Sequence, residues 1–240
     1  SRLGWLCDEG HRTEAADAIA AVCALPGLEV EGIYTHFANA DGDEAYTMGQ
    51  FTRFLELLSE LEGRGITFPI RHCAASAAVL KYPCTHLDMV RPGVALYGHY
   101  PDPSCEGLDG VGLRPVMALK TRVASVKAVP AGTPVSYGCT HVLERDAELA
   151  ALTVGYADGL PRLCSDRLEV LIRGQRAPIV GRVCMDMCMA DATGLGAAPG
   201  DEVELFGEHL PVEDAAALVG TIQYELLCAV SPRVPREYLN

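Results

Sequence analysis

Several residues of this 240-residue chain have types and positions that could support chemistry. Tyr156 ends an apolar run and enters a turn that contains Gly155, Asp158 and Gly159. Glycine and aspartate tolerate the backbone angles of tight turns, so the tyrosine would be held firmly with its hydroxyl at the surface of the core. Such a hydroxyl can exchange a proton with a ligand, although a tyrosine that only closes a hairpin has the same pattern.

A second group of polar residues lies where short apolar runs end. His36 and Ser76 each follow such a run, and Arg91 is followed by Pro92 and Gly93. A guanidinium beside glycine amides can bind an anion. The same residues also have purely structural interpretations, because Ser76 can be a helix N-cap and Arg91 can form a salt bridge. The pattern alone therefore indicates an α/β enzyme whose chemistry is undetermined.

Alternating strands and helices must position these residues in the first part of the chain. Apolar spacing predicts helices over 13–25, with Thr13 as N-cap, 48–61 and 77–81, and strands over 29–38, 71–74, 89–90 and 94–97. This alternation favours a parallel sheet, and in a TIM barrel the C-terminal strand ends carry the active site. Only about half of the eight βα units are present, so we predict a partial TIM-type barrel, an α/β fold whose N-terminal strands are missing.

A stretch rich in Pro, Gly, Asp and Ser over 100–115 is typical of a linker. Beyond it, short strands follow at close spacing, which predicts a mostly β domain. The expected strands are 116–129, 149–154, 168–172, 178–184 and 202–206, with helices over 212–219 and from 222. We therefore predict two domains, the C-terminal portion of a barrel over 1–110 and a β-rich domain over 111–240.

The composition excludes several classes of partner. A formal net charge of −13 argues against binding to nucleic acid or to anionic membranes. No apolar run is long enough for a membrane span, and the first residues do not resemble a signal peptide. The 10 cysteines are scattered without a C-x-x-C pair, which predicts reduced thiols in a cytoplasmic protein and no metal site.

Short motifs run through nearly the whole chain in a fixed order. They are Ser1–Gly4, Tyr34–Ala38, His72–Ala78, Met89–Gly98, Val135–Gly138, Val154–Gly159, Ala177–Asp186 and Arg233–Arg236. In this order they resemble the alanine racemase family, pyridoxal 5'-phosphate (PLP) enzymes with a TIM-type barrel followed by a C-terminal β domain. The resemblance implies a cytoplasmic isomerase that interconverts L- and D-alanine and supplies D-alanine for peptidoglycan.

The resemblance also implies a two-base mechanism, with a tyrosine and a lysine on opposite faces of the reacting carbon. PLP would withdraw electrons from that carbon and make its proton removable. Tyr156 corresponds to the base that takes the proton from L-alanine, His36 to its hydrogen-bonding helper, and Arg91 to the residue at the pyridine nitrogen. An arginine there stays protonated, which we expect to leave the ring nitrogen unprotonated and to suppress side reactions.

Further roles follow from the same resemblance. The residues that correspond to PLP contacts are Tyr34, His36, Ser76, Arg91, Gly93 and Val94. Arg2 and Met185 correspond to residues that meet the substrate carboxylate. In this family the C-terminal domain of one subunit completes the site of the other, so a homodimer is expected in which Tyr156 and Met185 serve the partner's cofactor.

Several departures from the family pattern matter. The family's PLP lysine lies upstream of the Arg2 motif, and Lys81, Lys120 and Lys127 are not in that context. We therefore expect an N-terminally truncated piece that does not racemise by itself. Pro232 stands where many members have a tyrosine that touches the phosphate, and Ala75 replaces a common asparagine.

Three other interpretations stay open. One is a serine racemase of the vancomycin-resistance type, because a methyl and a hydroxymethyl group are hard to discriminate. Another is a non-catalytic PLP-binding protein that has lost its lysine. A third, a PLP decarboxylase with a similar barrel, fits poorly because the motifs over 154–186 do not match.

Overall fold

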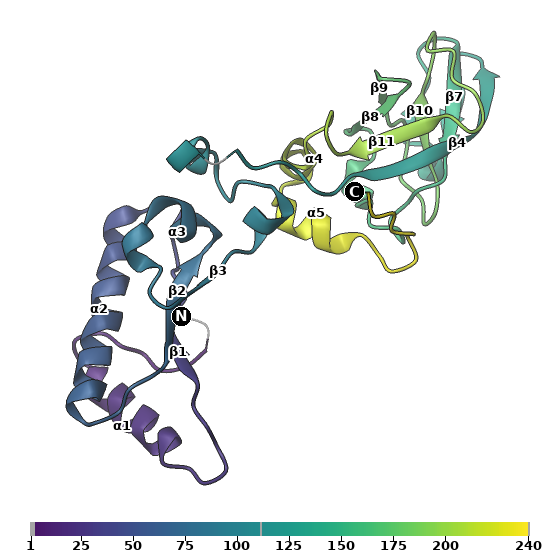
Figure 1. The fold of residues 1–240 in the computed structure, drawn as a ribbon. Helices are drawn as coiled ribbons and strands as arrows, with labels where there is room; N and C mark the ends of the chain where they lie inside the picture. The colour runs from purple at the N-terminus through teal and green to yellow at the C-terminus, as the bar shows by residue number, and fades with distance from the viewer. Residues whose placement is uncertain (1–2, 111, 240) are drawn as a thin grey trace. The chain divides into compact units, whose positions relative to one another are not determined.

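A computed structural model describes residues 3–110 and 112–239 of the chain (Figure 1). The chain divides into two compact units, Ser1–Arg114 and Pro115–Asn240. Their junction lies a few residues beyond the boundary that the linker composition predicts. Each unit has its own sheet and its own core, and each is described separately below.

The N-terminal unit is built from βα pairs. Its helices are α1 (Arg12–Cys23), α2 (Glu44–Gly63) and α3 (Ser76–Lys81), and its strands are β1 (Gly32–Tyr34), β2 (Ile70–Ala75) and β3 (Met89–Arg91). The strands pair in parallel in the order β1-β2-β3. The C-terminal ends of all three strands therefore lie at one edge of the sheet, as the alternating pattern predicts.

The α2 helix shows why the long apolar stripe was a reliable signal. It begins earlier than predicted because the Asp43 side chain caps it by accepting a hydrogen bond from the Tyr46 N–H. Its buried face carries Phe51, Phe54 and Leu61, and Leu61 packs in a core cluster with residues of α1. This stripe attaches the helix firmly to the unit.

Two local predictions in this unit are wrong. The stretch 94–97, predicted as a strand, is a 3-10 helix (Val94–Tyr97) that ends at Gly98, a left-handed residue with φ +81°. The first helix begins at Arg12 after His11, which makes no side-chain cap, so Thr13 lies inside it. Both stretches contain residues that suit several conformations, and contacts distant in sequence decide between them.

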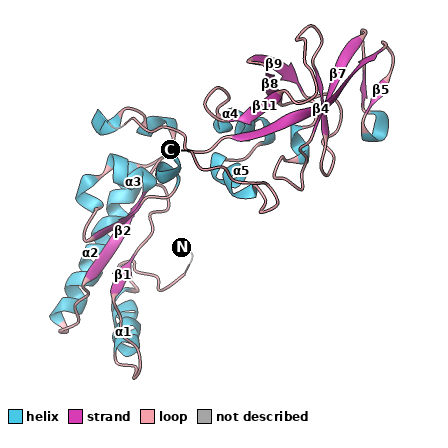
Figure 2. Ribbon diagram, turned by 45° about the vertical axis from the view of Figure 1, so that its right-hand side comes forward, coloured by secondary structure: helices cyan, strands magenta, loops and turns pink. Residues whose placement is uncertain are grey.

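The C-terminal unit is a mostly antiparallel β structure (Figure 2). Its strands are β4 (Leu119–Val129), β5 (Pro134–Val135), β6 (His141–Val142), β7 (Ala147–Leu152), β8 (Glu169–Ile172), β9 (Gln175–Pro178), β10 (Cys188–Asp191) and β11 (Glu202–Phe206), and its helices are α4 (Val212–Val219) and α5 (Gln223–Ala229). Six strands form one sheet in the order β10-β7-β4-β11-β8-β9, while β5 and β6 form a separate hairpin. The predicted strand 178–184 is wrong, because β9 ends at Pro178 and only Ile179 continues the pairing, as an isolated bridge with Ala190, before a loop leads to β10 at Cys188.

Two general properties complete the description. Within the described part of the chain, no helix is both long and apolar enough to cross a membrane. All ten cysteines lie in the described ranges and are free thiols. The chain thus combines a parallel βα unit with an antiparallel β unit, in the order that the resemblance implies.

Candidate active site

Arg91 joins the ends of the three parallel strands. One terminal nitrogen of its guanidinium donates to Nδ1 of His72, and the other donates to the backbone oxygens of Thr35 at 3.2 Å and Cys73 at 3.3 Å. Thr35 follows β1, while His72 and Cys73 belong to β2. The guanidinium therefore connects the C-terminal ends of β1, β2 and β3, and its planar shape fixes the geometry of these contacts.

His36 lies beside the same guanidinium. Its Nδ1 is 3.2 Å from a terminal nitrogen of Arg91. Arginine has no acceptor, so the histidine nitrogen must accept, and in the neutral ring the hydrogen is then on Nε2. Arg91 thus fixes which nitrogen of His36 can donate to another group.

Aromatic rings surround the arginine. The rings of Tyr34 and His72 stack with centroids 5.0 Å apart and planes 7° apart, and the Arg91 guanidinium carbon lies 5.1 Å from the Tyr34 centroid. Burial, and then the nearby Arg91 charge, lower the pKa of His72. Burial also lowers the pKa of Arg91, but arginine titrates so high that it stays protonated. The result is a permanent cation held beside the stacked rings of Tyr34 and His72.

Ser76 is not the N-cap that the sequence predicted. The cap residue of α3 is Ala75, and no side chain caps the helix. The buried Ser76 hydroxyl instead accepts hydrogen bonds from the backbone N–H groups of Gly93 at 2.8 Å and Ala95 at 3.3 Å. These bonds use its acceptor positions and leave its hydrogen to donate to a ligand oxygen.

Ser76, Gly93 and Val94 therefore lie together, as a phosphate site would require. Ala75 pairs with Arg91 between β2 and β3, so the serine directly follows the residue beside the arginine. A cationic side chain and a buried hydroxyl at one sheet edge favour an anionic ligand. Tyr34, His36, Ser76, Arg91, Gly93 and Val94 all gather at this edge of the N-terminal unit.

If the full-length protein binds PLP as the resemblance implies, replacing Ser76 with alanine should weaken that binding by about 10- to 100-fold, because a hydrogen bond to a charged group is lost. It also removes the acceptor that holds the Gly93 and Ala95 amides. Titration of PLP into the apoprotein, followed by absorbance, measures the change. The exposed Ser125→Ala is the matched control, and equal PLP affinity in both variants would contradict a phosphate role for Ser76.

In the C-terminal unit, the structure brings Tyr156 and Met185 together. The Tyr156 N–H donates to the Cys184 carbonyl at 3.0 Å, and the Ala157 N–H donates to the Met185 carbonyl at 2.9 Å. The side chains of Tyr156 and Met185 are 48% and 56% exposed, so both are accessible to a ligand. The turn and the loop after Arg182 thus form one surface.

Asp158 connects the turn at Tyr156 with the segment around Pro232. Its carboxylate accepts from the Gly155 N–H at 2.9 Å and pairs with the Arg233 guanidinium at 2.9 Å. The backbone oxygen of Asp158 also accepts from the Ser231 N–H at 3.2 Å. These contacts hold the segment that contains Pro232 against the Tyr156 turn, as expected if position 232 belongs to the site.

Tyr137 is a candidate site residue to which the sequence assigned no role. Its neighbour Ser136 has φ +64° and ψ −171°, a region used almost only by glycine, and Gly138 and Cys139 have φ +77° and +50°. Tyr137 itself is 72% exposed. Backbone strain of this kind concentrates at functional sites, so the observed strain points to Tyr137. Its motif, Val135–Gly138, was visible in the sequence, but the strain was not.

The two tyrosines are attached to the same loop. The Ser136 hydroxyl donates to the Arg182 carbonyl at 2.7 Å and lies 3.5 Å from Sγ of Cys184. The carbonyl of that same Cys184 receives the Tyr156 N–H. Tyr137, Tyr156 and Met185 therefore form a second group of candidate residues. Arg2 lies outside the described residues.

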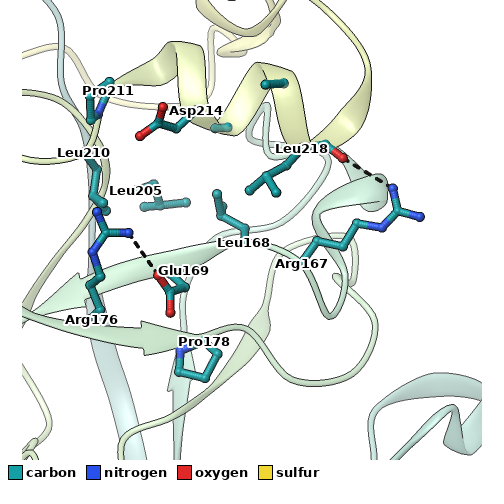
Figure 3. Close-up of a pocket in the computed structure, with 12 residues that line it drawn as sticks. Arg167, Leu168, Glu169, Arg176, Pro178, Leu205, Leu210, Pro211, Asp214 and Leu218 are labelled. Carbon is teal, nitrogen blue, oxygen red and sulfur yellow. Dashed lines mark hydrogen bonds and ion pairs between the residues drawn. The ribbon is translucent and has the colours of Figure 1, made fainter.

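A cavity of about 640 Å³ in the C-terminal unit lies elsewhere (Figure 3). Apolar side chains such as Leu168, Leu205 and Leu218 line it, with charged residues around them. Arg176 is bonded to Glu169 at 2.9 Å. None of the candidate site residues lines this cavity, so its shape adds nothing to the chemistry described above.

Comparisons with known proteins agree with the two-unit organisation. Residues 2–101 match the family model "Alanine racemase, N-terminal domain", and residues 116–238 match "Alanine racemase, C-terminal domain". The chain is 51% identical over 242 residues to an alanine racemase of Desulforamulus reducens. The aligned region covers 100% of this chain and 64% of that protein. It is 49% identical over 235 residues to an alanine racemase of Desulfovibrio desulfuricans, covering 96% of this chain and 63% of that protein.

Solved structures have the same architecture. An alanine racemase of Clostridium difficile in complex with cycloserine matches with a TM-score of 0.89 at 36% identity, over 98% of this chain and 62% of that one. The chain thus spans 64% of the length of the first of these relatives and a similar share of the others.

Proposed function

The chain belongs to the alanine racemase family, and we propose that the full-length protein containing it interconverts L- and D-alanine with PLP as cofactor. D-alanine made in the cytoplasm would then supply peptidoglycan synthesis. The predicted fold, a partial TIM-type barrel followed by a β domain, is that of the family.

The observation that carries this proposal is the cluster around Arg91. Its guanidinium contacts His72 and His36 and lies over Tyr34. Directly after β2, at the first residue of α3, the Ser76 hydroxyl accepts a hydrogen bond from the Gly93 N–H. A guanidinium beside an anion-binding hydroxyl fits a phosphorylated heteroaromatic ring. The hydroxyl of Ser76 can bond the phosphate, and the guanidinium of Arg91 can bond a ring nitrogen at the other end.

The chain's residues can accordingly be given roles around PLP. Ser76, Gly93 and Val94 would hold the phosphate, and Tyr34 and Arg91 would contact the ring end. When bound, PLP supplies an electron sink that makes the α-proton of alanine removable. Arg91 keeps its proton, so it would hold the ring nitrogen by a hydrogen bond without protonating it, which would moderate that sink. Met185, with Arg2, would orient the substrate carboxylate.

The base that acts on L-alanine is proposed to be a tyrosine of the C-terminal unit. The sequence assigned this role to Tyr156, whose backbone bonds to the loop that carries Met185. The strained loop at Ser136 favours Tyr137 for proton transfer, with Tyr156 beside the substrate. In either case His36, with Nδ1 occupied by Arg91, would donate from Nε2 to the tyrosine oxygen and stabilise its ionised form.

The second base is proposed to lie in a part of the full-length protein outside this chain. Lys81 donates to the Asp41 carbonyl and to the Ser104 hydroxyl, at 2.8 and 2.9 Å. Lys120 pairs with Glu202 at 2.7 Å. Lys127 lies exposed on β4. These lysines therefore have structural settings, and the chain alone should not racemise alanine.

We propose a homodimer in which the C-terminal unit of one subunit completes the site of the other. Co-expression of His36→Asn and Tyr137→Phe full-length subunits should then give mixed dimers with about half of the wild-type activity per dimer, because one of the two sites in each mixed dimer is intact. Activity of separately tagged, purified mixed dimers measures this. If the mixed dimers are as inactive as the two parent variants, each site is built within one subunit.

The function is tested with full-length, PLP-loaded enzyme on L-alanine and L-serine, with chiral chromatography of the products. A kcat/KM that favours alanine supports the proposal. Preference for serine would support the serine racemase alternative. PLP binding without racemisation of either amino acid would support a non-catalytic PLP-binding protein.

A further inference from the structure

We propose that Gln50 is a positioning residue for His36. This inference rests on the proposed racemase function and extends it from the residues at the sheet edge to the helix behind them. Gln50 lies on α2 and is half-buried. It would act through the backbone of the segment that carries the histidine.

The side-chain amide of Gln50 makes three hydrogen bonds to the segment that follows β1. Its Oε1 accepts from the Ala38 N–H at 3.1 Å, and its Nε2 donates to the His36 carbonyl at 2.9 Å and to the Thr35 hydroxyl at 3.0 Å. The orientation of the amide is fixed by its partners, because a backbone N–H can only donate and a carbonyl can only accept. The contacts therefore act as a clamp on both sides of His36.

The contacts of Gln50 hold a segment that no longer pairs with a neighbouring strand. The last backbone bond that joins this segment to β2 is from the Thr35 N–H to the His72 carbonyl, at 3.3 Å. Beyond it, the His36 carbonyl and the Ala38 N–H form their hydrogen bonds with the side chain of Gln50. His36 is thus held at the point where the sheet ends and its ring must meet Arg91.

The helix that provides the clamp is itself rigidly attached. Phe51, the residue after Gln50, packs edge-on against Phe37 with ring centroids 6.4 Å apart. Thr47, one turn earlier and fully buried, donates to the carbonyls of Asn39 at 3.1 Å and Asp43 at 2.7 Å. Gln50 therefore transmits the position of a packed helix to the backbone of His36.

The functional consequence concerns the contact between His36 Nδ1 and Arg91, at 3.2 Å. That contact decides which histidine nitrogen carries the hydrogen. Without Gln50, the carbonyl of His36 and the amide of Ala38 lose their side-chain partners, and the segment can shift. A displacement near 1 Å is enough to impair proton transfer in an active site.

The test uses Gln50→Leu in the full-length, PLP-loaded enzyme. We expect kcat to fall about 10- to 100-fold with KM nearly unchanged, because the site is misaligned while the substrate contacts remain. Thr47→Val is the matched control. It removes the hydrogen bonds from the same helix to Asn39 and Asp43, in the loop that precedes the helix, and leaves the backbone bonds of His36 and Ala38 in place. It should lower the melting temperature while leaving kcat near wild type.

Two further measurements separate positioning from a general loss of structure. If Gln50 acts through His36, the double variant with His36→Asn should be no slower than His36→Asn alone. In ¹⁵N-histidine NMR, the ring signals of His36 should shift in Gln50→Leu and stay in place in Thr47→Val. Additive losses in kcat, or an unshifted His36 signal, would overturn the inference.

The outcomes also distinguish this inference from the proposed function. A wild-type enzyme that does not racemise alanine would contradict the proposed function. The NMR comparison would still decide whether Gln50 positions His36. An active wild-type enzyme with an equally active Gln50→Leu variant keeps the function and removes Gln50 from it.

Discussion

Tyr137→Phe in the full-length enzyme is expected to lower kcat for racemisation of L-alanine by about 10²- to 10⁴-fold, the usual contribution of a positioned acid–base group. The change removes one hydroxyl and keeps the ring, so the strained loop and PLP binding should be retained. Stopped assays with chiral product analysis give kcat and KM, and PLP absorbance confirms that the cofactor is still bound.

Tyr156→Phe is the matched comparison, since it makes the same change on the other tyrosine of the loop surface. We expect a higher KM with a smaller loss of kcat, as for a residue that contacts substrate without moving its proton. The opposite result, a large kcat loss in Tyr156→Phe and near-normal kcat in Tyr137→Phe, would return the base to Tyr156. Near-normal kcat in both variants would remove a C-terminal tyrosine from the mechanism.

The preference for Tyr137 comes from energetics that a sequence does not display. Holding Ser136 in its observed conformation costs of the order of 1–3 kcal/mol. The bond from its hydroxyl to the Arg182 carbonyl offsets part of that cost. A strained backbone persists only where surrounding contacts impose it, and here those contacts come from the loop that also carries Met185.

Long apolar stripes made most of the fold predictable. The α2 stripe and the alternating β4 stretch produce elements at the expected places because many residues agree with one period. The stretch Val94–Tyr97 does not form the predicted strand, since its residues suit a strand or a tight turn equally well. The 3-10 helix forms there between Gly93 and Gly98, with the Ser76 hydroxyl bonded to Gly93, which is distant in sequence.

The candidate site was predictable to a similar degree. Polar residues at strand ends meet in any parallel sheet, so His36, Ser76 and Arg91 could be grouped from their positions alone. The role of Gln50 could not be predicted, because a polar residue on an amphipathic helix has the pattern of a solvent-facing residue. Its role depends on a carbonyl and an amide that no longer have strand partners.

Gly155→Ala is expected to destabilise the C-terminal unit by about 3 kcal/mol or more, the upper range for an overpacked core, and to abolish racemisation. Sequence reasoning explained Gly155 by unusual backbone angles, yet its φ is not positive, in contrast to Gly159 at +113°. The reason is space. A Cβ there would lie 2.2 Å from the Cys184 carbonyl oxygen and 2.5 Å from Met185 backbone atoms.

Those obstructing atoms are backbone, so they cannot rotate away, and the turn must separate from the loop. Separation breaks the bonds from Tyr156 and Ala157 to Cys184 and Met185, which couples the stability of the unit to the geometry of its candidate site. Thermal unfolding and activity of the full-length enzyme measure both effects. Gly63→Ala is the control, because a Cβ at that helical position meets nothing within 4 Å and alanine favours a helix. A Gly155→Ala enzyme with wild-type melting temperature and activity would show that the turn and the loop need no close approach.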